Sequence, residues 1–188
     1  MNAPSSRRNA TRLRRSLAAV AGAALLMAAC SSDTPESLIA SGKAFAAKKD
    51  HKAAVIQYKA ALQRQPESGE ARLLLGQALL ATGDPVNAAV ELTKALDQKQ
   101  PAAVVVPSLA RALLLTGEYK KLVTQYGDLT LDDKQAQASL KAAVATAWGA
   151  LGNREKTEAA IEAANAAMPD YPPTKLLLAR TAAGQRKF

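Results

Sequence analysis

The sequence predicts an all-α fold, an α-solenoid of about four to four and a half helix-turn-helix repeats. The first supporting observation is a pattern of small and apolar residues that recurs every 34 or 35 residues. The second is composition: 48% of the residues are hydrophobic but only 4% are aromatic, so the helix formers alanine and leucine supply most of the apolar content. The pattern places unit starts at Pro35, Gly69, Ala103, Ala138 and Pro172.

Equivalent positions in successive units carry similar residues, as expected when each unit buries one face against its neighbour. Glycine stands at positions 42 and 76, where the paired helix has to approach closely. The recurring first-helix positions are Ser41, Gly42 and Phe45, then Leu75, Gly76 and Leu79, and the second-helix positions are Ala54, Tyr58 and Ala61, then Ala88, Leu92 and Ala95.

Helix-start and helix-stop residues separate these segments. Asp33 to Glu36 supplies a capping side chain, a proline in the first turn and an early carboxylate, so a helix should begin there. Asp50 should cap the second helix, which Pro66 ends. In the second unit, Gly83 permits a left-handed turn and Asp84 caps the helix that follows.

The third unit departs from the pattern in its second helix. Leu122 and Leu129 stand where small residues belong, and Gly127 followed by Asp128 interrupts the helix early. We therefore expect a shortened second helix and a longer link, in which Thr130 and Asp133 form a capping box for the next helix.

The fourth unit returns to the pattern, and a fifth begins but does not reach a second helix. Trp148 falls at the offset of Phe45 and Leu79, so core packing is the favoured role of its ring. The last segment, 172–188, is either a partial repeat or a capping helix. If the chain is truncated from a longer array, the apolar side of this segment around Leu178 and Ala182 would be exposed or bound by a partner.

These observations divide the chain into a leader, a short tether, a repeat array and a final helix. The ranges are 1–29 for a signal peptide, 30–34 for a lipidated cysteine and tether, 35–171 for the repeats (35–68, 69–102, 103–137 and 138–171) and 172–188 for the final helix.

The leader has the features of a secretory signal peptide. Five arginines between positions 7 and 15 precede the apolar run from Leu17 to Ala29, whose 13 residues are too few to span a bilayer. The run ends in small residues directly before Cys30, the sole cysteine of the chain, and this junction resembles a bacterial lipobox. The resemblance implies a covalent lipid on Cys30; the alternative is an ordinary signal peptide in which Cys30 is incidental.

The formal net charge of +9 comes largely from this leader. Cleavage after Ala29 would remove five arginines and leave 20 basic residues against 16 acidic ones, which argues against nucleic acid as a partner. Ser31, rather than aspartate, follows the cysteine. For a bacterial lipoprotein this implies release to the outer membrane, facing the periplasm.

With these positions in place, residues 35–184 resemble the tetratricopeptide repeat (TPR) family. Segments 30–38, 53–63 and 70–76 also resemble the amino-terminal region of TPR lipoproteins associated with PEP-CTERM/exosortase sorting and exopolysaccharide production. Those proteins carry many more repeats, so this chain would be a complete member, a short paralogue or a fragment. The second resemblance implies a scaffolding role in assembly or export.

The sequence shows no catalytic or cofactor-binding constellation, so no enzyme activity and no cofactor other than the covalent lipid are expected. His51 is the only histidine and lies at the start of a helix with an exposed surface. One histidine and scattered carboxylates do not assemble a zinc site or a nucleophile triad.

The remaining candidate is the concave face built by the first helices, which would bind a protein partner of the cell envelope. A partly basic, partly apolar groove suits an extended peptide with acidic groups, or an anionic polysaccharide within an export machine. A pilus or outer-membrane-protein assembly lipoprotein is a further alternative, and the basic residues could equally be ordinary solvated surface residues. The predicted partner-binding residues are Lys43, Leu73, Gln77, Leu80, Arg111, Leu114, Thr146 and Arg180.

Overall fold

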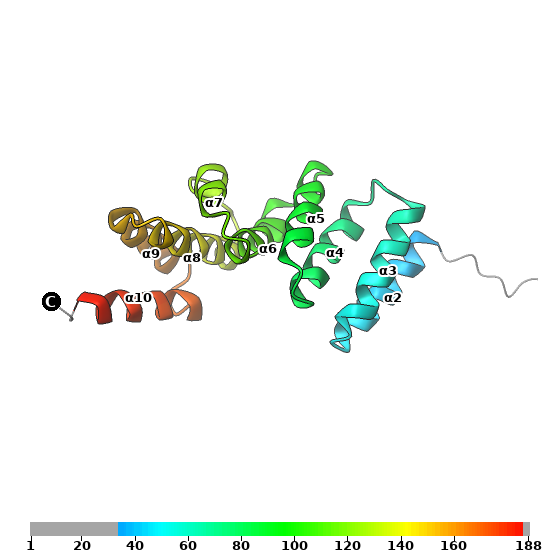
Figure 1. Cartoon of the computed structure of the whole chain (residues 1–188), viewed down its shortest axis with the longest axis horizontal. Helices are drawn as coiled ribbons and strands as arrows, with labels where there is room; N and C mark the ends of the chain where they lie inside the picture. The colour runs from blue at the N-terminus through cyan, green and yellow to red at the C-terminus, as the bar shows by residue number, and fades with distance from the viewer. Residues whose placement is uncertain (1–33, 186–188) are drawn as a thin grey trace, which may run out of the picture. The chain divides into compact units, whose positions relative to one another are not determined.

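The computed structural model describes residues 34–185, and every regular element in that range is an α-helix (Figure 1). The helices are α2 (Pro35–Ala47), α3 (His51–Arg64), α4 (Gly69–Ala81), α5 (Pro85–Asp97), α6 (Ala102–Leu115), α7 (Tyr119–Tyr126), α8 (Lys134–Ala150), α9 (Arg154–Ala167) and α10 (Pro172–Gln185). Helices α2 to α9 form four antiparallel pairs, and α10 follows them as the last helix that the structure describes. The predicted all-α solenoid is confirmed.

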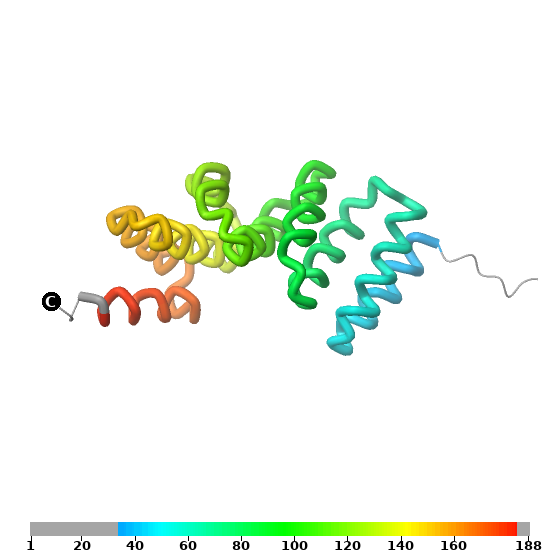
Figure 2. The backbone as a smooth tube through the Cα atoms, viewed as in Figure 1, coloured from blue at the N-terminus to red at the C-terminus, as the bar shows by residue number. Residues whose placement is uncertain are grey.

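The pairs stack in chain order (Figure 2). Each second helix, namely α3, α5, α7 or α9, packs against the first helix of its own pair and against the first helix of the next. The first helices α2, α4, α6, α8 and α10 also contact one another in succession. They therefore make one continuous layer, which we call the first-helix face.

The apolar positions of the repeat form two clusters of buried residues. The main cluster runs from Ala54 of α3 to Ile161 of α9, and a smaller cluster joins α2 to α3 and α4 through Leu38 and Ile39. The largest fully buried side chains of the main cluster include Tyr58, Leu92, Leu109, Leu113, Leu122 and Leu140. Because these side chains come from every pair, each repeat depends on its neighbours for burial.

Most of the predicted helix boundaries are confirmed. The side chain of Asp50 accepts a hydrogen bond from the backbone N–H of Ala53 at 3.0 Å, and Asp84 caps α5 in the same way. Gly83 has φ +84°, in the left-handed region that favours glycine. The first pair makes the equivalent turn with Lys49 at φ 63°, a conformation that a lysine adopts less easily.

The third pair is shortened as predicted, but the capping box is wrong in detail. Helix α7 has 8 residues, whereas α3, α5 and α9 have 13 or 14. Asp133 is itself the N-cap of α8, since its side chain accepts from the N–H of Ala136 at 2.7 Å. Thr130 lies outside the helix, because Leu131 is buried and its N–H donates to the side chain of Gln137 instead.

The predicted signal peptide and Cys30 lie outside the described residues. Within residues 34–185, no helix has both the length and the hydropathy needed to cross a membrane.

Candidate partner-binding groove

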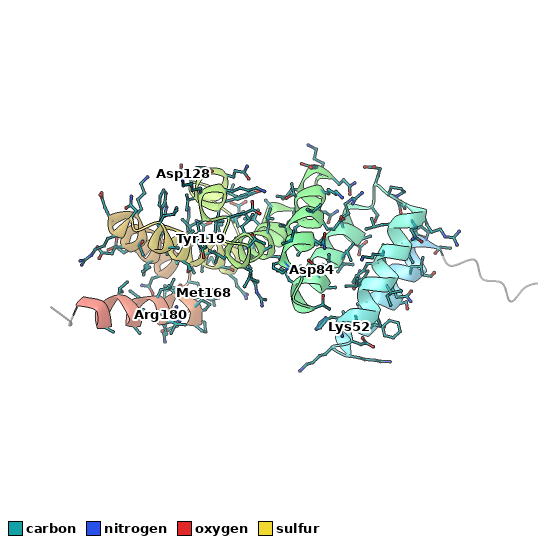
Figure 3. All side chains as sticks on the ribbon, in the orientation of Figure 1. Lys52, Asp84, Tyr119, Asp128, Met168 and Arg180 are labelled. Carbon is teal, nitrogen blue, oxygen red and sulfur yellow. The ribbon has the colours of Figure 1, made fainter. Side chains whose placement is uncertain are left out.

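A groove of about 270 Å³ opens on the first-helix face between α6, α8 and α10. Four of the predicted partner-binding residues, Arg111, Leu114, Thr146 and Arg180, line it together. Figure 3 labels Arg180 on α10. The other residues lining it are Pro107, Ser139, Ala142, Ala143, Tyr171, Pro173, Leu176 and Leu177.

The groove combines apolar walls with two guanidinium groups. Arg111 and Arg180 are both exposed, and neither has a salt-bridge partner among the residues that the structure describes. The hydroxyl of Thr146 donates to the carbonyl of Ala142 at 2.9 Å, so its oxygen can still accept a hydrogen bond from a ligand. An anionic group on an otherwise apolar ligand would satisfy both features of this surface.

The other predicted partner-binding residues lie elsewhere on the layer. The ammonium group of Lys43 is 2.6 Å from Glu70 of α4, so its charge is compensated. Gln77 is half-buried. Leu73 and Leu80 are each only 8% exposed and belong to the main core, so they offer packing rather than open surface. Among the predicted partner-binding residues, the positive charges without a described salt bridge are therefore Arg111 on α6 and Arg180 on α10.

The segment before α10 also contributes to the groove, which the repeat pattern did not predict. Tyr171 precedes the proline pair that starts α10, and it lines the groove together with Leu176 and Leu177. The repeat period identifies Leu176 as an equivalent of Leu73, but in α10 that position is 53% exposed. The proline pair at positions 172 and 173 could have indicated this contribution, because it fixes where α10 begins and so places Tyr171 directly before the helix.

A second, larger cleft of about 500 Å³ lies between α7, α8 and α9, where α7 ends early. Trp148 is half-buried and packs against the main core, as predicted, but its ring also lines this cleft. The ammonium group of Lys156 lies 4.3 Å from the centre of that ring, within range for a cation–π interaction. We call this the α7–α9 cleft.

Lys141 lines the same cleft and stabilises the end of α7. Its ammonium group donates to the carbonyl of Gly127, the C-cap residue of α7, at 2.7 Å. A positive charge is favourable at a helix C-terminus. Partial burial lowers the pKa of Lys141, and the nearby carboxylate of Asp128 opposes that shift.

The described residues show no arrangement of metal ligands. In residues 34–185, no three side chains of His, Cys, Asp or Glu lie close enough to hold a metal ion. His51 is the first residue of α3, as predicted.

Comparison with known proteins agrees with the architecture. The family model of the tetratricopeptide repeat matches residues 45–106, which extend from α2 into α6. No curated protein matches the chain. The repeat period and the helix pairing continue the same architecture through residues 35–185, which form an all-α solenoid of about four to four and a half TPR-type helix-turn-helix repeats.

Proposed function

We propose that this protein is a membrane-anchored scaffold whose first-helix groove binds a partner protein through a segment that is both acidic and apolar. TPR arrays generally bind proteins, which supports a role in protein–protein interaction. The observation that carries the finer proposal is the groove between α6, α8 and α10. It combines two unpaired guanidinium groups with leucine and proline side chains.

The chemistry of the groove favours an extended segment over a folded surface. Its volume of about 270 Å³ accommodates a few side chains, not a domain. Arg111 and Arg180 approach it from two different helices, so a segment lying along the face meets both cations. Arginine binds carboxylates through paired hydrogen bonds, which would fix the register of a segment carrying Asp or Glu.

The anchoring part of the proposal depends on Cys30. The signal peptide, the lipobox resemblance and Ser31 support an outer-membrane lipoprotein that faces the periplasm. Cell-envelope assembly, with PEP-CTERM-linked exopolysaccharide export as the first candidate system, follows from the family resemblance of segments 30–38, 53–63 and 70–76. Pilus or outer-membrane-protein assembly is the alternative setting.

Membrane fractionation with metabolic acyl labelling tests the anchor. The unaltered chain should carry the label and sediment with the outer membrane, whereas Cys30→Ala should lose the label and leave that fraction. A Cys30→Ala protein that stays in the outer membrane would refute lipid anchoring through this residue.

Site-specific photo-crosslinking in the intact envelope tests the groove. A photoreactive residue replaces Thr146, which is exposed within the groove. A defined partner band should form and should disappear when Arg111→Glu and Arg180→Glu are combined. Lys52→Glu on α3 is the matched control, because Lys52 is an exposed cation outside the groove (Figure 3). Equal crosslinking in both variants would refute the groove as the binding site.

An anionic polysaccharide is a second candidate ligand, because the same two arginines would attract any polyanion. Calorimetric titration with polygalacturonate should then show binding that weakens as salt is raised and that requires Arg111. Absence of salt-sensitive binding would remove this candidate.

A further inference from the structure

One side of α10 is apolar, open and distinct from the groove. Leu178 is 42% exposed, and Ala179 and Ala182 are exposed as well. At about 100° per residue, Leu178 and Ala182 lie on the side of α10 opposite to the groove residues Leu176 and Arg180, and Ala179 lies on the flank between the two sides, outside the groove lining. A helix that is apolar on opposite sides is normally covered on both.

The repeat register shows what covers this side elsewhere in the array. Three equivalents of these residues contact the second helix of their own pair: Gly42 faces Tyr58 of α3, Gly76 faces Leu92 of α5, and Trp148 lies beneath Lys156 of α9. In α4, Leu75 is 3% exposed, Leu79 is 6% exposed and Gly76 is buried. The equivalent residues of α6 and α8 are Leu109, Ala110 and Leu113, then Val144, Ala145 and Trp148. All of these are buried except Trp148, which is half-buried.

The contact at this position is specific in shape. A Cβ atom added to Gly76 would lie 2.6 Å from Cγ of Leu92, so the second helix inserts one large side chain against the small residue. Alanines flank Leu92 on the same helix, four positions before it and three after it. Ala88 and Ala95 are fully buried, so these small residues let the backbones approach closely.

We propose that Leu178, Ala179 and Ala182 form a docking site for an amphipathic helix of a partner protein. That helix carries a large apolar residue with small residues four positions before it and three after it. The partner helix would occupy the place that a second helix of the pair takes in the preceding repeats. This surface is separate from the first-helix groove, so the proposal stands independently of the groove.

The charges around the site specify the partner helix further. Lys175 stands at the register of Arg72, whose guanidinium lies 2.7 Å from Glu91 of α5, the residue directly before Leu92. Lys175 now pairs with Asp170 at 2.7 Å, but both side chains are at least 60% exposed, and such surface pairs are weak. An acidic residue directly before the large apolar residue would therefore find Lys175 accessible.

The same charges disfavour a second copy of this helix as the occupant. Lys175 and Arg180 are the described charged side chains of α10, and both are positive. Two copies of α10 packed through this side would bring the Lys175 side chains toward each other, and α10 itself has no acidic residue to offset the repulsion. An acidic helix of another protein suits the site better.

The sequence of α5 is a ready probe, because it has every feature that the proposal requires. A fluorescein-labelled peptide spanning residues 84–98 is titrated with the full chain, and binding is followed by fluorescence anisotropy. We expect saturable binding at micromolar to millimolar concentration, since an isolated helix of this length is marginally stable and has to fold on binding. A peptide with Leu92→Glu should bind at least tenfold more weakly.

Variants of the chain identify the surface that is occupied. Ala179→Glu should weaken peptide binding at least tenfold, whereas Ala166→Glu, at an exposed alanine of α9, should leave it unchanged. A peptide with Glu91→Lys should bind two- to fivefold more weakly to the unaltered chain and regain affinity for Lys175→Glu. Circular dichroism of each variant confirms that it remains folded.

Three results would overturn the proposal: no saturable binding, undiminished binding to Ala179→Glu, or concentration-dependent dimerisation that Ala179→Glu abolishes. The third would assign the surface to a second copy of the chain. Arg111→Glu should leave peptide binding unchanged, so a failure at this site is distinguishable from a failure of the groove.

Discussion

Replacement of Gly76 by alanine should destabilise the array, although alanine is the better helix former. The new Cβ atom would lie 2.6 Å from Cγ and 2.9 Å from Cδ2 of Leu92, and 3.3 Å from the backbone oxygen of Ala88. Leu92 is fully buried and cannot move away freely. Overpacking of this kind costs about 2–3 kcal/mol, and the gain in helix propensity returns about 1 kcal/mol. The net loss should be about 1–2 kcal/mol.

Urea denaturation followed by circular dichroism measures this loss, and Gly149→Ala provides the matched control. A Cβ atom at Gly149 of α8 would meet only the side chain of Thr157, at 3.8 Å, which is an ordinary contact. That variant should be as stable as the unaltered chain or up to about 1 kcal/mol more stable. A Gly76→Ala protein that matched or exceeded the stability of Gly149→Ala would refute the close-approach argument.

The contacts of Asp84, Lys156 and Glu91 can each be tested by a single substitution. Hydrogen bonds from Asn87 hold the pKa of the Asp84 carboxyl below its usual 3.8, so the stability that this carboxylate contributes is present above that pH and is lost as the pH falls through the lowered pKa. The free energy of unfolding, followed as the pH is lowered, should therefore fall less in Asp84→Asn than in the unaltered chain. Equal losses of stability in the two proteins would contradict this. Lys156→Met should shift the fluorescence emission of Trp148, the only tryptophan of the chain, and should change the free energy of unfolding by at most about 1 kcal/mol. An unchanged emission spectrum would argue against the cation–π contact. Glu91→Gln should lower the free energy of unfolding, measured by urea titration, by about 1–3 kcal/mol, because it removes the charged partner of the mostly buried Arg72. Charge reversal of Arg72 and Glu91 together should recover part of the stability that either reversal alone loses. Additive losses in the double variant would contradict the pairing.

The features that could be predicted from the sequence are those that nearby residues decide. Asp50 and Asp84 cap helices because their carboxylates reach backbone N–H groups three residues ahead. The early end of α7 follows from Gly127 and Asp128, which do not continue a helix well. The period itself predicted which residues face the core, because helix pairs stack at equivalent positions.

The features that could not be predicted depend on contacts between distant elements. The start of α8 depends on Leu131, whose burial and bond to Gln137 hold the link out of the helix. The groove depends on how α10 packs against α8, which no local pattern encodes. Offsets within the repeat placed Leu73 and Leu80 on the same face as Arg111, but burial differs between repeats because the neighbouring helices differ.

The seven residues that follow the short helix α7 divide the described solenoid into two unequal parts, α2 to α7 and α8 to α10. Nearest-neighbour interfaces determine how unfolding spreads along such an array. Here the coupling between the two parts runs mainly through the direct contact of α6 with α8, together with the few turns of α7. A protease that cut this link would therefore leave two fragments joined by the contacts of α8 with α6 and α7, one with the three helix pairs from α2 to α7 and one with the pair α8 and α9 followed by α10.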